Sequence, residues 1–302
     1  MDRALMGRRP DFVIIGAMKG ATSTLHEQLA AQPEVFMSTP KEPGFFSHDE
    51  HFARGIEWYE SLFASAEDQQ ICGESSTYYT KRPEFPQSAD RMVEMIPDAK
   101  LIYVIRHPVR RLVSHYIHAW SQKEYLGSIR RAVEEYAPLV DCGRYAMQLE
   151  PYLKAFGRNR ILLVFSERLT SDSQNELERI GRFLGLKTTP RWNDNLGPAN
   201  VSSERMRNSA ARDAIVYAPG ISQIRQCLPQ SWRERVKRFW KMRKRPQLNA
   251  MQQAQLTAIF DEDLAQLGAW TETGLSCDSF DEIARSSTPR WSETLTHGIE
   301  VR

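Results

Sequence analysis

The hydrophobic pattern alternates between short apolar runs and longer segments with apolar residues at helical spacing. Residues 12–15 (FVII) form an apolar, mostly β-branched run that ends at Gly16, which predicts a buried strand followed by a tight loop. Hydroxyl residues at 22–24 then offer N-caps for a helix that runs to about Ala31. The pattern predicts a strand, a loop and a helix.

Two further units of this kind follow. Residues 100–105 (KLIYVI) form an apolar run that leads to Pro108, a residue suited to the first turn of a helix. Residues 161–165 (ILLVF) predict another strand, and apolar residues within 177–184 indicate a helix that ends at Gly185. Strands that alternate with helices favour an α/β fold, with a central parallel sheet flanked by helices.

The segments between and after these units are less regular. Residues 55–63 and 88–96 have helical patterns, and Ile71 lies in a short apolar stretch. Near the end of the chain, a last helix is predicted to bury one face. The residues expected on that face are Leu256, Ile259, Phe260, Leu264 and Leu267.

We interpret the chain as a single domain over residues 1–302. Its core is expected over about 10–190, followed by a C-terminal part of helices and loops over 191–280 and a loosely held tail over 281–302. With 41% hydrophobic and 26% charged residues, the chain can bury a sizeable core, so disorder throughout is excluded.

Net charge and apolar content limit the kinds of partner and the location that we expect for this protein. Forty Lys and Arg against 38 Asp and Glu give a net charge of +2, too balanced to predict a general polyanion binder, so no nucleic-acid partner is expected and an anion site has to be local. No apolar run approaches the ~20 residues of a membrane-spanning helix, and the first residues lack a signal-peptide pattern. We therefore expect an unprocessed cytoplasmic protein. The spacing of Cys, His and acidic residues indicates no metal site.

The loop at residues 16–24 (GAMKGATST) has the composition of a phosphate-binding loop. Its lysine, Lys19, precedes the second glycine, whereas in the GxxxxGK[ST] motif of ATP-binding proteins the lysine follows it. Gly20 lets the backbone approach an anion, and a helix N-terminus after it directs N–H groups outward. A doubly charged terminal group would suit this site, with a plain strand-to-helix turn as the alternative. The residues that supply these N–H groups are Ala21, Thr22, Ser23 and Thr24.

A second anion site is predicted where the strand at 100–105 ends. Arg106 follows that strand, and Ser114 lies eight residues later, about two helical turns on. Open α/β sheets bind ligands at this edge, and a guanidinium with a hydroxyl is a good phosphate receptor. The alternatives are a surface ion pair for Arg106 and a helix-face hydroxyl for Ser114.

The two sites together resemble those of the sulfotransferases that use 3′-phosphoadenosine 5′-phosphosulfate (PAPS). Residues 41–46 (KEPGFF), 97–116 and 156–172 are similar in order and spacing to segments of the heparan-sulfate-type and bacterial members. The resemblance covers roughly residues 10–190, with a weaker match over 246–268. It implies a P-loop NTPase-like sulfotransferase fold.

The resemblance also implies roles for single residues. Residues 19–24 would hold the 5′-phosphosulfate, and Arg106 and Ser114 would bind the 3′-phosphate. Glu42 matches the family's general base, and Lys19 would stabilise the leaving group. Lys41 is expected to hold the acceptor or to lower the pKa of Glu42, with a plain surface lysine as the alternative.

The expected reaction moves a sulfuryl group from PAPS to a hydroxyl or amine of a carbohydrate, glycolipid or small metabolite, without a metal. Arg205 is expected to close over the 3′ side of the donor. A histidine base is an open alternative to Glu42, because relatives that act on phenols and steroids use one. The histidines that keep it open are His48, His51, His115 and His118.

The sequence departs from the family pattern at three positions. Ala21 stands where the family more often has glycine or another small residue, which is harmless if its φ is negative. His107 replaces the usual Asp or Asn, so the partner that orients Arg106 is open. Ser75 stands where relatives that modify heparan sulfate often have Lys, which weakens the transfer of their acceptor specificity.

Two other functions stay open beside this one. Residues 233–245 carry eight basic side chains and one acid, which favours a solvated helix face but also suits peripheral contact with an anionic membrane or glycan. A membrane- or polyanion-binding module without catalysis is therefore one alternative. The other is a P-loop kinase that uses ATP and magnesium, which the position of Lys19 disfavours.

Overall fold

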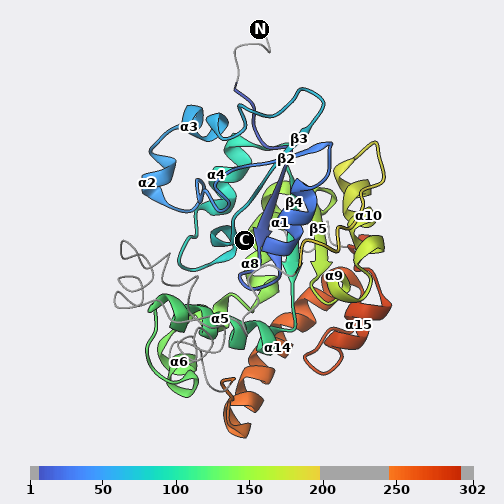
Figure 1. Cartoon of the computed structure of the whole chain (residues 1–302). Coiled ribbons are helices and arrows are strands. Elements are labelled where there is room, and N and C mark those ends of the chain that lie inside the picture. Colours follow the sequence, from blue (N-terminus) through green and yellow to red (C-terminus); the bar gives the residue numbers. More distant parts are fainter. Residues whose placement is uncertain (1–6, 198–244, 294–302) are drawn as a thin grey trace, which may run out of the picture.

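The computed structural model describes residues 7–197 and 245–293, and it has a parallel sheet at its centre (Figure 1). The sheet has five strands in the order β2-β3-β1-β4-β5, and every neighbouring pair is parallel. The predicted α/β class with a central parallel sheet is confirmed. The strands are β1 (Phe12–Gly16), β2 (Val35–Met37), β3 (Ile71–Ser75), β4 (Lys100–Ile105) and β5 (Ile161–Phe165).

Helices cover both faces of this sheet. On one face α1 and α10 pack against alternate strand residues such as Phe12 and Ile14. On the other face α4, α5, α8 and α14 pack against the residues between them, such as Val13 and Ile15. The longer helices are α1 (Thr22–Ala30), α4 (Ser88–Met95), α5 (Pro108–Gln122), α8 (Tyr145–Phe156), α10 (Ser173–Leu184) and α14 (Ala250–Thr271).

Shorter elements connect these helices to the strands. They are α2 (Asp49–Phe52), α3 (Ile56–Ser61), η2 (Thr77–Thr80), α6 (Ile129–Glu135), α7 (Pro138–Asp141), η3 (Arg158–Arg160), α9 (Arg168–Ser171) and α15 (Phe280–Ser286). Two of them, η2 and α9, follow directly after β3 and β5. Both therefore lie at the edge of the sheet where parallel α/β proteins bind ligands.

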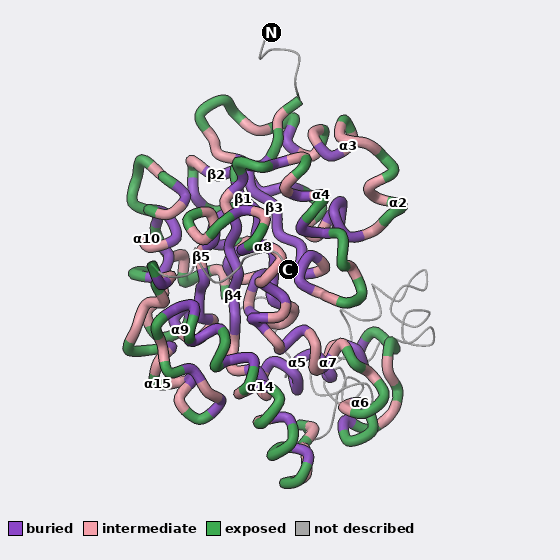
Figure 2. The backbone as a smooth tube through the Cα atoms, turned by 180° about the vertical axis from the view of Figure 1, so that it is seen from behind, coloured by how far each residue is buried: buried purple, intermediate pink, exposed green. Residues whose placement is uncertain are grey.

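Burial on both faces explains why these strands appear in the sequence as apolar runs. Every residue of β1 is buried, as are all but the first of β4, because helices exclude water from both faces of a parallel sheet. Figure 2 shows this core as a continuous buried band along the strands. The strands predicted at 12–15, 100–105 and 161–165 and the helices predicted within 55–63 and 88–96 are all present.

Two local predictions are wrong. The hydroxyl residues at 22–24 do not cap the first helix, since its N-cap is Ala21, which forms no side-chain capping bond. The reason is that the loop turns through Ala21, so Thr22 already belongs to the helix. Ile259 is 40% exposed and not part of the buried face of α14, because neighbouring helices cover only the stripe from Leu256 to Leu267.

Candidate functional site

A cavity of about 770 Å³ lies at the carboxyl ends of the strands. Its walls come from the loops after β1 and β2, from η2, from one face of α5, from α9 and the start of α10, and from residues 192–197. Arg205 lies outside the described residues. The predicted site residues that line the cavity are Lys19, Ala21, Thr22, Ser23, Thr24, Lys41, Glu42, Arg106 and Ser114.

The loop after β1 is held tightly against the neighbouring strand β4. Ala17 donates its N–H to the carbonyl oxygen of Val104 over 2.7 Å, and the Gly20 N–H bonds back to Ala17 over 2.8 Å. A Cβ at Gly20 would collide with that same Val104 carbonyl, so only glycine fits there. Backbone contact therefore sets the shape of this loop.

Two other residues of the loop adopt the left-handed backbone conformation. Lys19 has φ 67° and Ala21 has φ 75°, so the condition under which alanine would be harmless at position 21, a negative φ, is not met. For a residue with a Cβ this conformation costs about 1–2 kcal/mol. The first helical hydrogen bond runs from Leu25 to Ala21 over 3.2 Å, so the amides of 22–24 form the helix N-terminus, where anions bind.

Arg106 leaves the end of β4 and is fixed through its backbone. The hydroxyl of Tyr145 accepts a hydrogen bond from the Arg106 N–H over 3.3 Å and donates one to the Arg106 carbonyl. Burial lowers the pKa of the Arg106 guanidinium, and the nearby Glu167 offsets part of this. Among the described residues the guanidinium has no hydrogen-bond partner, while the hydroxyl-bearing Ser114, 2% exposed, lines the same cavity. A guanidinium desolvated in this way gains strongly from an anionic ligand.

Glu167, at the end of β5, orders the turn after Arg106. Its Oε1 accepts a hydrogen bond from the His107 N–H over 3.1 Å and forms an ion pair of 2.9 Å with Arg110. The acid that the family pattern has at position 107 is thus replaced by one from the next strand. Sequence reasoning missed Glu167, although it lies within the segment 156–172 that carried the resemblance.

Glu42 lies on the opposite side of the β1 loop from Arg106, in the loop after β2. Two groups bond to its Oε1: the Lys41 ammonium at 2.8 Å and the Thr77 hydroxyl at 3.3 Å. Its backbone N–H bonds to the Ser75 carbonyl over 2.9 Å, and its φ is 61°. Within the described chain Oε2 has no hydrogen-bond donor. A strained backbone and a carboxylate held by two hydrogen bonds are typical of functional sites.

The four histidines kept as alternative bases differ in position. His118, on α5, lines the cavity. His48 and His51 pack among aromatic rings away from it, with His48 4.6 Å from the ring centroid of Phe85. His115 is buried beside Arg111, and burial together with that guanidinium holds its pKa well below the usual range. Geometry therefore leaves His118 as the histidine at the site.

A second carboxyl group, Glu74, is buried at the end of β3. Burial raises its pKa to about 8, and the phenols of Tyr59 and Tyr79 offset only part of that rise. Neither of its oxygens has a hydrogen bond of good geometry among the described residues. At neutral pH the carboxyl is therefore largely protonated, which limits the negative charge near Glu42. Local sequence does not indicate this, because the burial of an acid depends on tertiary packing.

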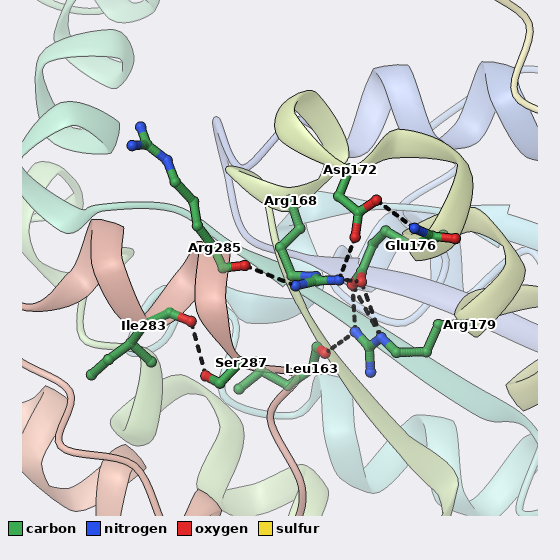
Figure 3. Close-up of polar contacts among 9 residues, drawn as sticks. Leu163, Arg168, Asp172, Glu176, Arg179, Ile283, Arg285 and Ser287 are labelled. Carbon is green, nitrogen blue, oxygen red and sulfur yellow. Dashed lines mark hydrogen bonds and ion pairs between the residues drawn. The ribbon is translucent and has the colours of Figure 1, made fainter.

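Ion pairs stabilise the wall of the cavity formed by α9 (Figure 3). The fully buried Glu176 binds the Arg168 Nε over 2.9 Å and also pairs with Arg179. Arg168 donates a further bond to the carbonyl of Arg285 over 3.2 Å, and Arg179 donates one to Leu163 over 2.7 Å. These contacts join α9, α10, β5 and α15, so the wall is held by buried, paired charges.

Comparisons with known proteins give a consistent result. Residues 9–268 match the family described as the sulfotransferase domain. The chain is 38% identical over 191 residues to heparan sulfate glucosamine 3-O-sulfotransferase 6 from Homo sapiens, covering 60% of this chain and 54% of that protein. It is 36% identical over 187 residues to heparan sulfate glucosamine 3-O-sulfotransferase 3A1 from Mus musculus, covering 59% and 46%. The chain thus spans about half the length of the curated relatives it matches.

A solved structure supports the fold. The sulfotransferase from Alicyclobacillus acidocaldarius superposes with a TM-score of 0.63 at 24% identity, over 89% of this chain and 98% of that chain. At this sequence identity the similarity supports the fold alone, and that fold agrees with the sheet and helix layers described above. The predicted P-loop NTPase-like sulfotransferase fold is confirmed.

Two predictions about location and partners do not hold. The expectation of a cytoplasmic protein is wrong, because it is contradicted by the match to relatives named as heparan sulfate glucosamine 3-O-sulfotransferases. Membrane contact through residues 233–245 is not supported, and 233–244 lie outside the described residues. In the described part of the chain, no helix combines the length and apolar character that crossing a bilayer requires.

The family match extends across most of the chain and includes the loop after β1, the segment from Arg106 to Ser114 and the Glu42 loop. These segments, which the sequence predicts as parts of one site, line the same cavity. The chain therefore belongs to the sulfotransferase family.

Proposed function

We propose that this protein transfers a sulfuryl group from PAPS to a hydroxyl group of a carbohydrate. The observation that carries the proposal is that Lys19 and its loop share one cavity with Arg106 and Ser114. PAPS has charged groups at both the 5′ and the 3′ positions, so it needs two separate anion receptors. ATP lacks the 3′-phosphate, and Lys19 stands before Gly20, unlike the lysine of ATP-binding loops.

The proposed reaction is an in-line displacement at sulfur. The acceptor oxygen attacks the sulfur, the bond between sulfur and the bridging 5′-phosphate oxygen breaks, and adenosine 3′,5′-bisphosphate leaves with that electron pair. The acceptor's proton passes to Glu42. Lys19 and the amides of 22–24 stabilise the charge that develops on the leaving phosphate.

The contacts of Glu42 support its role as the base. Lys41 and Thr77 both bond to Oε1, which orients the carboxylate and leaves Oε2 as the oxygen that takes the proton. The Thr77 hydroxyl also contacts the sulfur of Met18, in the β1 loop, over 3.4 Å, so that its one proton is shared between this sulfur and Glu42 Oε1. This contact couples the base to the loop that would hold the transferred group. His118 is the second candidate, because it also lines the cavity.

A carbohydrate acceptor is favoured by the relatives. Their names describe sulfation of heparan sulfate at a 3-hydroxyl of glucosamine. The Glu42 side of the cavity is lined by polar groups, among them Lys41 and Thr77, as hydrogen bonding to sugar hydroxyls requires. Lys41 would then bind both the acceptor and the Glu42 carboxylate.

The proposal is tested with radiolabelled PAPS and a panel of glycans that includes heparan sulfate and its desulfated forms. We expect label transfer with release of adenosine 3′,5′-bisphosphate. Glu42→Gln should lower kcat by about 10²–10⁴-fold, the usual scale for loss of a general base, with unchanged donor affinity. The exposed Glu57→Gln on α3 is the matched control. If the wild type binds no bisphosphate nucleotide, the proposal fails; if Glu42→Gln has normal turnover, the base is elsewhere.

A further inference from the structure

A positively charged side chain, Arg111, is buried behind the wall of the cavity. It lies on α5, and its exposed fraction is 0%. Ser114, about one turn further along the same helix, lines the cavity, whereas Arg111 does not reach it. An arginine is almost never fully buried unless an opposite charge pairs with it. The groups around Arg111 therefore show whether its charge is compensated.

Only uncharged groups of the described residues contact this guanidinium. Its Nη1 donates to the Met18 carbonyl oxygen over 3.4 Å, and its Nη2 donates to the Leu139 carbonyl oxygen. Nη1 also lies 3.2 Å from Nδ1 of His115, and because a guanidinium can only donate, that imidazole nitrogen accepts. The Nε of Arg111 has no hydrogen-bond partner in this part of the chain. No acid of the described residues forms an ion pair with Arg111, so its charge is buried without a counter-charge from them.

His115 reports the sign of the charges in this buried region. Burial holds its pKa well below the usual range, and the Arg111 guanidinium lowers the pKa further. Lys81 and Lys19 act on His115 in the same direction, so the charges that reach this imidazole are positive. A buried charge that lacks a partner destabilises the folded protein. An anion bound nearby would remove that cost.

The bond to Met18 links Arg111 to the phosphate-binding loop. A peptide unit is planar and trans, so the Met18 carbonyl and the Lys19 N–H point in opposite directions. By holding that carbonyl, Arg111 fixes the direction of the Lys19 N–H, in a residue with the left-handed φ of 67°. Met18 and Lys19 both line the cavity. One peptide unit thus connects the buried guanidinium to the loop.

We propose that Arg111 is a positioning residue for the 5′-phosphosulfate of the donor, which it affects through the peptide unit of Met18 and Lys19 and through its uncompensated charge. The proposal rests on the proposed function, which assigns that group to the loop at 16–24. Charges interact strongly across a region of low dielectric, so an anionic group on the loop would supply the counter-charge that the described residues lack. Arg111 should therefore serve the 5′ end of the donor, whereas Arg106 serves the 3′ end.

The first test uses calorimetry with two nucleotides, adenosine 5′-phosphate and adenosine 3′-phosphate. Arg111→Gln removes the charge, and we expect it to weaken binding of adenosine 5′-phosphate by about 10-fold, as loss of one charge near a phosphate implies. Binding of adenosine 3′-phosphate should be unchanged. Arg111→Lys keeps the charge and should retain most of the affinity for adenosine 5′-phosphate. The control is Arg131→Gln, whose side chain is 70% exposed.

The second test keeps Arg111 and changes the group beside it. His115→Glu places a carboxylate against the guanidinium and compensates its charge, so it should also weaken binding of adenosine 5′-phosphate. His115→Gln is the matched control, because its amide oxygen is a neutral acceptor like the imidazole nitrogen, and it should bind as the wild type does. The two variants differ in charge and hardly in size. They therefore test the role of the charge even where Arg111→Gln does not fold, and thermal unfolding shows which variants are folded.

The outcomes separate this proposal from the one on which it rests. If the wild type binds both nucleotides and the variants Arg111→Gln and His115→Glu bind adenosine 5′-phosphate equally well, the positioning proposal is overturned while the proposed function stands. An equal loss for both nucleotides also overturns it, since a structural defect alone would weaken both. If the wild type binds neither adenosine 5′-phosphate nor adenosine 3′,5′-bisphosphate, the donor assignment fails and the positioning proposal fails with it.

Discussion

The two sides of the sheet edge at the carboxyl ends of the strands carry opposite chemistry. On the side of β2 and β3 the strand ends bear acids, with Glu42 in the loop after β2 and Glu74 at the end of β3. On the side of β1 and β4 they bear cations, with Lys19 in one loop and Arg106 at the other strand end. The strand order β2-β3-β1-β4-β5 separates the two sets. A sulfuryl donor needs the cationic side, and an acceptor that loses a proton needs the acidic one.

The sides also differ in how charge is controlled. On the cationic side Arg106 is partly desolvated, and Glu167 offsets only part of the effect on its pKa. On the acidic side the deeper carboxyl is kept protonated by burial, while the shallower Glu42 is bonded by Lys41 and Thr77. The Arg106 guanidinium is thus left to gain from an anionic ligand, whereas burial of Glu74 limits the negative charge on the acidic side. The difference teaches that one sheet edge can serve two opposite tasks when burial differs between neighbouring strands.

The largest expected effect is on the acidic side and concerns stability against pH. Glu74 has a pKa of about 8 when folded against 4.5 as its ordinary value, so between these values the folded state binds more protons than the unfolded state. Stability should therefore fall as pH rises through this window, by up to about 1.4 kcal/mol per pH unit. Urea unfolding of the wild type and of Glu74→Gln across pH 4 to 9 checks this.

Glu74→Gln should remove that decline and become more stable than the wild type at pH 8, since its amide carries no charge at any pH. Glu50→Gln, at an exposed acid, is the control and should follow the wild type. Parallel pH curves for the wild type and Glu74→Gln would show that the carboxyl does not titrate in this window.

On the cationic side, removal of the Arg106 guanidinium should weaken the binding of nucleotides that carry a 3′-phosphate and leave other nucleotides unaffected. Arg106→Ala is expected to lose about 10- to 100-fold in affinity for adenosine 3′,5′-bisphosphate, as loss of a charge-assisted hydrogen bond implies. Adenosine 5′-phosphate, which lacks the 3′ group, should bind as before. Calorimetry with both ligands measures this, with Arg131→Ala as the control because its side chain is 70% exposed. An equal loss for both nucleotides would contradict a 3′-specific role.

The smallest effect is expected where the two sides meet, in the β1 loop. Ala21 has φ 75°, so Ala21→Gly should relieve part of the 1–2 kcal/mol of strain while raising the entropy of the unfolded chain, for a net gain of about 0.5 kcal/mol. Thermal unfolding should show a slightly higher Tm. Ala30→Gly, at the end of the same helix, has no such strain to relieve and should lower it. A lower Tm for Ala21→Gly would mean that the loop needs the alanine methyl group.

The elements with strong local patterns were predictable. The strands at 12–15, 100–105 and 161–165 are buried on both faces, so their apolar runs stand out from the flanking polar residues. By contrast, β2 has three residues and β3 contains Cys72, Gly73 and Glu74, so neither has a distinctive pattern. Only their parallel pairing with neighbours defines them as strands.

The candidate site was predictable only in part, for a related reason. Lys19, Arg106, Ser114 and Glu42 follow strands or resemble family motifs, so local sequence and spacing were enough to select them. Arg111, by contrast, bonds to the carbonyls of residues 18 and 139, which lie 93 and 28 positions away in the sequence. Nothing in the local sequence around Arg111 or Met18 indicates the other.

The amino-acid pattern alone determined the α/β class, the loop after the first strand and the family, because each is encoded by residues that are near one another in the chain. Tertiary structure decided which residues share the cavity, which carboxyl stays protonated and which conformation Ala21 adopts. These depend on burial and on contacts between distant segments, which set the local dielectric and the hydrogen-bond partners of each group.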